Sequence, residues 1–274
     1  GPHDVTDVTN VKEVLPGERD YDEDILTEHE TPTGEYGQSL YPYARQPEKL
    51  MSYKIRMQAY ENYELDFEDA LEAIRRVDNL TRGLDKKCYL VGWQTNGHDT
   101  GYPYIGEVNP RHKRPMDETS LDSLKWLIKE AKEKYNTTIT LHVNFSDAYT
   151  DDDPISQQML EDQLAIREAD GSIRATGYWA GHKGYSVSAY GNYFTGNWQK
   201  NQVDPLLEMV PELEGQSIHP DAWYSWNDPY YGLGSDKTTD AQRRSAMYMR
   251  ENYGMDQTTE FDVAFGAGEE FQED

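Results

Sequence analysis

The sequence predicts a parallel α/β fold, because five strand patterns alternate with helical patterns through residues 52–261. Two further observations narrow this class. The chain lacks the GxGxxG and GxxxxGK[ST] motifs that a nucleotide-binding, doubly wound sheet usually carries. Polar and aromatic residues instead follow the ends of strands, where a (β/α)8 TIM-type barrel builds its active site. We therefore expect an incomplete barrel, with about five of the eight βα units.

Alternation and apolar runs define the expected strands. Residues 88–93 form a short continuous apolar run, which is typical of a parallel strand buried on both faces. Residues 137–144 alternate strictly, with Ile139, Leu141 and Val143 on one face and polar side chains on the other. The predicted strands cover residues 52–59, 88–93, 137–144, 216–223 and 255–261.

Two helices have clear start signals. In residues 66–77 the apolar side chains fall on one helical face, and Asp66 is placed to cap the N-terminus. Residues 119–135 carry the strongest helical pattern of the chain. Thr119 and Asp122 have the spacing of a capping box, so we expect this helix to begin there.

The later helices are less regular. Helical patterns cover residues 155–166, 198–213 and 239–253. Pro205 and Pro211 interrupt the second of these, which predicts a kink or an early end. Thr239 and Gln242 have capping-box spacing and mark the expected start of the third.

The composition excludes several classes of function as first expectations. With 26 basic and 51 acidic side chains, the net charge is −25, which disfavours nucleic acid and anionic membranes as partners. No apolar stretch approaches the length of a membrane span, so we expect no membrane insertion. Cys88 is the single cysteine, which rules out an intramolecular disulfide. The 21 Tyr and 6 Trp suit sugar rings as well as an ordinary protein surface.

The chain divides into three parts by composition. Residues 1–47 hold 11 acidic and 3 basic side chains without an apolar period, which predicts an acidic N-terminal arm or linker. Its first residues have neither a basic nor an apolar signal-peptide region, so we expect no signal peptide there. Residues 48–263 form the expected barrel portion, and residues 264–274 form a tail.

Asp221 and Glu260 are the expected catalytic pair. They lie 39 residues apart, one strand–helix unit, so they would end neighbouring strands. A retaining glycosidase needs two carboxyl groups roughly 5–5.5 Å apart, and adjacent barrel strands can supply that separation. The alternative is that two of the chain's 51 acidic residues end strands by chance.

Other residues near strand ends are candidates for holding a sugar. His98 and Asp99 follow Gly97 on a loop, where an imidazole and a carboxylate can bind adjacent hydroxyls, although such a tripeptide can also be an ordinary turn. Trp179 lies in a glycine-rich stretch, where it could stack on a pyranose or fill the edge of a core. The remaining candidates for substrate binding are Trp93, Asn144 and Trp223.

We expect neither a metal nor another cofactor. His98, His142 and His219 could meet at strand ends, which keeps a metal site as an alternative. No HxH or HExxH spacing supports that alternative.

Several motifs together resemble a known family. Residues 52–261 are similar to the catalytic barrel of the endo-α-N-acetylgalactosaminidases, glycoside hydrolase family 101, with the family 129 enzymes as relatives. The motifs, in order, are Tyr53–Arg56, Asp78–Leu84, Tyr89–Trp93, Gly97–Asp99, Gly106–Asn109, Ser123–Trp126, Leu141–Asn144 with Asp147–Ala148, Ile218–Ala222 and Thr258–Phe261.

The resemblance implies a retaining enzyme that releases O-glycan sugar, typically Galβ1-3GalNAc, from Ser or Thr of mucin-type glycoproteins. It implies Asp221 as the nucleophile and Glu260 as the acid/base. His98 and Asp99 would contact the GalNAc. An extracellular or cell-surface location follows from the same resemblance.

Two alternatives remain open from the sequence. Pro220 stands directly before the expected nucleophile, where proline removes a hydrogen-bond donor from a central strand. Together with the length of the chain, it favours a carbohydrate-binding or adhesin-like barrel that has little or no turnover. The second alternative is an exo-acting α-N-acetylgalactosaminidase.

Overall fold

A computed structural model of the 274-residue chain provides the coordinates. It describes residues 51–58, 65–94, 97, 102–103, 105–149, 154–179 and 182–258. The predicted acidic arm at 1–47 and the predicted tail at 264–274 lie outside these residues. Among the described helices, none has both the length and the apolar character needed to cross a membrane.

Five parallel strands form one sheet, and their order follows the sequence. Each strand adds to the same edge of the sheet, as in a barrel, whereas a doubly wound sheet reverses its order at one point. The described chain therefore confirms the predicted α/β class and the part-barrel arrangement. In spatial order the strands are β1 (Met51–Arg56), β2 (Lys86–Val91), β3 (Thr137–Asn144), β7 (Ser217–Asp221) and β8 (Asp256–Gln257).

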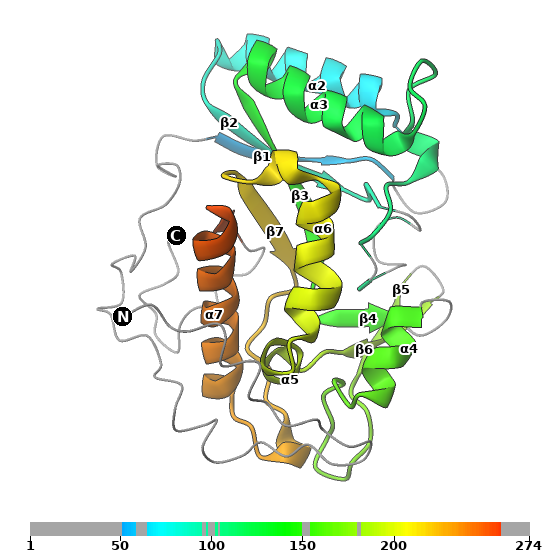
Figure 1. Cartoon of the computed structure of the whole chain (residues 1–274), viewed down its shortest axis with the longest axis vertical. Coiled ribbons are helices and arrows are strands. Elements are labelled where there is room, and N and C mark those ends of the chain that lie inside the picture. The colour runs from blue at the N-terminus through cyan, green and yellow to red at the C-terminus, as the bar shows by residue number, and fades with distance from the viewer. Residues whose placement is uncertain are drawn as a thin grey trace, which may run out of the picture.

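Helices α2 (Phe67–Thr81) and α3 (Ser120–Tyr135) lie side by side against β1–β3, at the top of Figure 1. Their apolar faces pack on the apolar side chains of the strands, including Cys88, Leu90 and Leu141. Burial raises the pKa of the Cys88 thiol, so this cysteine is a core residue in its neutral form. The opposite face of the sheet is left for polar residues.

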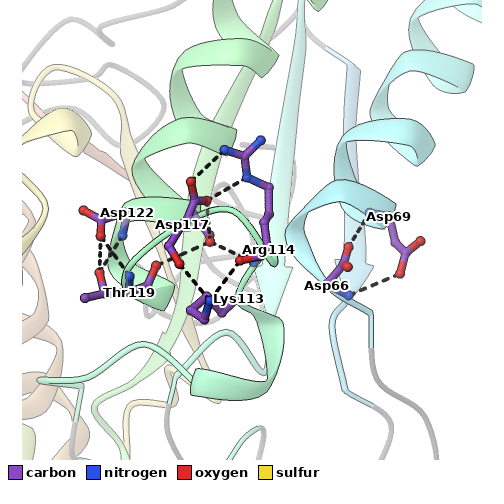
Figure 2. A network of polar contacts seen from close by, with 8 residues as sticks. Asp66, Asp69, Lys113, Arg114, Asp117, Thr119 and Asp122 are labelled. Atoms are coloured by element: carbon purple, nitrogen blue, oxygen red, sulfur yellow. Dashed lines mark hydrogen bonds and ion pairs between the residues drawn. The ribbon is translucent and has the colours of Figure 1, made fainter.

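Figure 2 shows how both helices begin. The Asp66 carboxylate accepts a hydrogen bond from the amide of Asp69, and Asp69 accepts one from the amide of Asp66. Thr119 and Asp122 make the same reciprocal pair at the start of α3. These bonds satisfy amides that the first helical turn leaves open, and they confirm both predicted N-termini.

The segment before α3 is fixed by Arg114 and Asp117. The guanidinium donates two hydrogen bonds of 2.7 and 2.9 Å to the Asp117 carboxylate, and it lies 3.5 Å from the centre of the Trp126 ring. Hydrogen bonds from Arg114, then from Ser123, lower the pKa of Asp117 to about 2. This contact is part of the network drawn in Figure 2.

Helix α7 (Ser235–Tyr253) begins four residues earlier than predicted, so the expected capping box of Thr239 and Gln242 is wrong. Both residues lie within α7, and their side chains bind the segment that follows β7. Thr239 Oγ1 lies 2.9 Å from Ser225 Oγ, and Gln242 Nε2 donates a 3.0 Å hydrogen bond to the carbonyl of Tyr224. These two residues have the spacing of a capping box, but their side chains make tertiary contacts and cap no helix.

The predicted helix at 198–213 is divided in the structure. Residues 198–213 consist of the π-helical η4 (Trp198–Val203), α6 (Asp204–Met209) and the short 3-10 helix η5 (Pro211–Leu213), and a separate short helix, α5 (Ala189–Phe194), precedes them. Pro205 lies in the first turn of α6, where proline is tolerated, and Pro211 follows its end. The helix expected at 155–166 is also shorter, because α4 (Pro154–Glu161) ends at Glu161.

A second, antiparallel sheet was not predicted. It has the order β4-β6-β5 and is inserted between β3 and the helices that return the chain to β7 (Figure 1). Trp179, expected on a loop, is the last residue of β5 and pairs with His182, although its side chain lies outside what the structure describes. The strands are β4 (Asp147–Tyr149), β5 (Ala175–Trp179) and β6 (His182–Ser186).

Candidate active site

The polar side chains of β3 and β7 lie side by side on one face of the sheet. Parallel pairing sets these residues in register, and all of them are buried. The arrangement agrees with the predicted alternation in 137–144, and it ends at the carboxyl edge of the sheet, where barrels carry their active sites. In order toward that edge, the neighbouring pairs are Thr140 and Ser217, then His142 and His219, then Asn144 and Asp221.

Asp221 is the last residue of β7, and its side chain is 12% exposed. Oδ1 accepts a 2.8 Å hydrogen bond from the amide of Ala222. Ala222 has φ +48°, a left-handed conformation that a non-glycine residue rarely adopts, so the chain turns sharply after the carboxylate. Oδ2 lies 3.6 Å from Nε2 of His142. The carboxylate is therefore held at the strand end by the amide of Ala222 on one side and faces the His142 imidazole on the other.

Asn144 is the direct neighbour of Asp221 on β3. Its Oδ1 accepts hydrogen bonds from the amides of Ser146 and Asp147, at 2.8 and 2.9 Å. Its Nδ2 donates to the Asp147 carboxylate at 2.9 Å. The structure places Asn144 beside the expected nucleophile, and these bonds show that it also shapes the turn from β3 into β4.

The two tryptophans lie beneath the site. Trp93 has no exposed surface, and its Nε1 donates a 2.8 Å hydrogen bond to the carbonyl of His142. Trp223 is 3% exposed and packs edge-to-face on Phe145, with ring centres 5.5 Å apart. Neither ring presents an open face in this structure, so the expectation that Trp93 and Trp223 bind substrate gains no support from their burial.

Three candidate residues, His98, Asp99 and Glu260, lie outside the described residues. The residue before the first two, Gly97, has φ +76° and donates its amide to the Gln94 carbonyl at 2.9 Å. The positive φ favours glycine at position 97, and a Cβ there would also displace the end of the Gln58 side chain.

The nitrogens of the two described site histidines already face other groups. His142 Nδ1 lies 3.1 Å from Tyr102 OH, and His219 Nδ1 lies 2.8 Å from Thr258 Oγ1. Within the described part of the chain, no group of three histidine, cysteine or acidic residues is arranged to hold a metal. The alternative of a histidine metal site, which also needed His98, has no support in that part.

Pro220 does not interrupt the pairing that positions Asp221. Backbone groups of alternate residues in a strand face opposite neighbours. The Ile218 carbonyl accepts a 3.0 Å hydrogen bond from Thr258, so Ile218 and Pro220 face β8, whereas His219 and Asp221 face β3. The missing N–H of Pro220 therefore falls on the β8 side, beyond the last described pair of β7 and β8.

We expect Pro220→Val to change kcat/KM by less than about tenfold, a barrier change of about 1.4 kcal/mol. The variant restores an N–H on the β8 side and leaves the β3 ladder as it is. Steady-state kinetics on an aryl glycoside measure the effect. A much larger gain in activity would show that Pro220 impairs turnover. That result would favour the alternative of a carbohydrate-binding barrel with little or no turnover.

Comparison with known proteins identifies a matching family and several similar structures. The sequence model described as endo-α-N-acetylgalactosaminidase, glycoside hydrolase family 101, matches residues 40–271. The ligand-free α-N-acetylgalactosaminidase NagBb from Bifidobacterium bifidum superposes with a TM-score of 0.55 at 16% identity, over 82% of this chain and 36% of that one. An α-amylase from Lactobacillus plantarum gives 0.51 at 15% identity, over 76% of this chain and 44% of that one.

At such identities, these structures show a shared fold. The chain spans 36% of the length of NagBb, so it corresponds to part of that protein. The sequence model, by contrast, matches well over half of the chain. The protein therefore belongs to the endo-α-N-acetylgalactosaminidase family of glycoside hydrolases, family 101.

Proposed function

We propose that the chain carries the catalytic pair of a retaining glycoside hydrolase that releases Galβ1-3GalNAc from Ser or Thr of mucin-type glycoproteins, outside the cell. The observation that carries the proposal is Asp221, a buried carboxylate at the carboxyl end of a central parallel strand. Membership of family 101 supports the enzyme class. A structure of NagBb in complex with GalNAc supports the sugar, because that protein shares the fold.

The proposed reaction is a double displacement. Asp221 attacks the anomeric carbon while Glu260 protonates the departing Ser or Thr oxygen, which gives a glycosyl–Asp221 ester. Glu260 then takes a proton from water, and the water oxygen attacks the same carbon and frees Asp221. Two inversions leave the sugar with its original anomeric configuration.

The register of β7 and β8 supports this pairing. Ser217 lies opposite Asp256, and Ile218 lies opposite Gln257. If that register continues for three residues, the partner of Asp221 is Glu260. Neighbouring strands lie about 4.8 Å apart, close to the separation of roughly 5–5.5 Å between the carboxyl groups of retaining enzymes.

Two aryl glycosides test the proposal. Cleavage of aryl Galβ1-3GalNAcα supports the endo-acting enzyme, and cleavage of aryl GalNAcα alone identifies an exo-acting one. The second outcome is worth testing because NagBb is named an α-N-acetylgalactosaminidase. Sugar binding without cleavage of either compound would identify a carbohydrate-binding barrel.

We expect Asp99→Ala to weaken binding of GalNAc by roughly 1–3 kcal/mol, the usual loss when a buried hydrogen-bonding partner is removed. The reason is the proposed contact between the His98–Asp99 loop and sugar hydroxyls. Calorimetry with GalNAc measures the change, and Asp236→Ala on the first turn of α7 serves as a control of equal charge. Unchanged affinity would show that Asp99 does not contact the sugar and that the loop is an ordinary turn.

A further inference from the structure

His142 is a buried side chain that the proposed reaction does not use. It is 1% exposed and lies on β3, one layer below Asn144. Its Nε2 faces Oδ2 of Asp221 at 3.6 Å, and the other oxygen of that carboxylate accepts the Ala222 amide. The two oxygens of the expected nucleophile therefore have different neighbours, a backbone amide and an imidazole.

The imidazole is fixed from behind. Tyr102 OH lies 3.1 Å from Nδ1 and is itself buried, and the Trp93 indole donates to the carbonyl of His142 at 2.8 Å. The Tyr102 carbonyl in turn accepts a 2.9 Å hydrogen bond from Tyr149 of β4, which ties this segment to the second sheet. When the Tyr102 hydroxyl donates to Nδ1, the ring proton sits on Nε2, the nitrogen that faces Asp221.

We propose that His142 is a positioning residue for the nucleophile, donating its Nε2–H to Oδ2 of Asp221 while Tyr102 sets the tautomer. The inference rests on the proposed function. A distance of 3.6 Å is longer than a hydrogen bond, and an approach of about 0.5 Å on substrate binding closes it, as catalytic contacts often do. The proton stays on Nε2 throughout, so His142 orients the carboxylate and stabilises its charge.

Other titratable groups share this end of the sheet. His219 of β7 has its ring centre 5.5 Å from that of His142, and Tyr89 of β2 stacks on His219 at 4.3 Å. Asp147 of β4 reaches the site through Asn144. A titration of Asp221 reports all of them, so the test compares variants that differ at His142 alone.

The test uses carbon-13 NMR of carboxyl-labelled aspartate in the purified full chain, with Asp221→Asn to assign the Asp221 signal. His142→Phe keeps a ring but removes the donor, and we expect the titration midpoint of Asp221 to rise by about 1 pH unit. His142→Gln keeps an N–H donor and should recover part of the shift. His112→Phe is the matched control, because His112 is also fully buried but bonds the Gly92 carbonyl.

Kinetics provide a second readout. In His142→Phe, kcat should fall by about 10²-fold, the scale of a misplaced reacting group, with little change in KM. The acidic limb of kcat/KM should move to higher pH with the NMR midpoint. If His142→Phe does not fold, Tyr102→Phe tests the same contact, with a smaller shift in the same direction.

An Asp221 midpoint that is equal in wild type and in the folded variants would overturn the inference. Equal shifts in His142→Phe and His112→Phe would also overturn it, because the effect would then be a general loss of a buried ring. Failure of the proposed function looks different. In that case the wild type cleaves neither aryl glycoside, while the NMR titration midpoint of Asp221 still depends on His142.

Discussion

Asp221→Asn should reduce turnover of aryl Galβ1-3GalNAcα by roughly 10⁴-fold or more, the scale expected when a catalytic nucleophile is removed. An amide cannot form the glycosyl ester. It does keep the size of the carboxylate, and its carbonyl oxygen can still accept the amide of Ala222. We therefore expect the variant to fold and to bind the sugar. Steady-state kinetics and calorimetry on the same preparation measure the two effects separately.

Asp228→Asn is the matched control for this experiment. Asp228 lies on the same connection between β7 and α7, is 2% exposed, and accepts a 3.2 Å hydrogen bond from the amide of Arg167. The same substitution at this buried aspartate should lower stability more than activity. Near wild-type turnover in Asp221→Asn would remove Asp221 from the role of nucleophile.

Elements with strong local patterns were predictable. The strict alternation in 137–144 gives β3 with its bounds intact, and the apolar stripe with its capping box gives α3 to within one residue. In these segments the local pattern and the tertiary packing demand the same structure. The order of the parallel strands follows for the same reason, since each strand adds to the edge left by the one before.

Segments whose structure depends on distant partners were not predictable. The pair Thr239 and Gln242 has the spacing of a cap, yet its partners are the carbonyl of Tyr224 and the hydroxyl of Ser225. The antiparallel sheet of β4–β6 has short strands and many polar residues. One signal for it was present: β5 ends and β6 begins on either side of Ala180-Gly181, and such a two-residue spacing is typical of a hairpin.

The site shows the same division. The end of β7 and its neighbour on β3 follow from sequence position, so Asp221 and Asn144 were predicted to share the carboxyl edge. The part played by His142 was not predicted, although its place on the polar face of 137–144 was visible. Its contact with Tyr102 spans 40 residues, and no local pattern indicates it.

Glu260→Ala should slow release of natural serine-linked glycans by roughly 10²–10⁴-fold, the usual contribution of a general acid or base. A serine alkoxide is a poor leaving group and needs a proton as the bond breaks. A nitrophenolate leaves without one, so formation of the glycosyl–Asp221 ester from a nitrophenyl glycoside should suffer much less. Rates on a serine-linked glycopeptide and on a nitrophenyl glycoside, measured in parallel, give the comparison.

The second step separates an acid/base role for Glu260 from a structural one. Without a base to take its proton, water attacks the ester slowly, so the intermediate should accumulate in Glu260→Ala. Azide is already an anion and needs no base, and its addition should restore turnover and yield the glycosyl azide with retained configuration. Glu251→Ala near the end of α7 removes a carboxylate from an exposed position and should show neither effect. Equal losses of Glu260→Ala on both substrates, with no azide product, would mean that Glu260 is structural and that another residue is the acid/base.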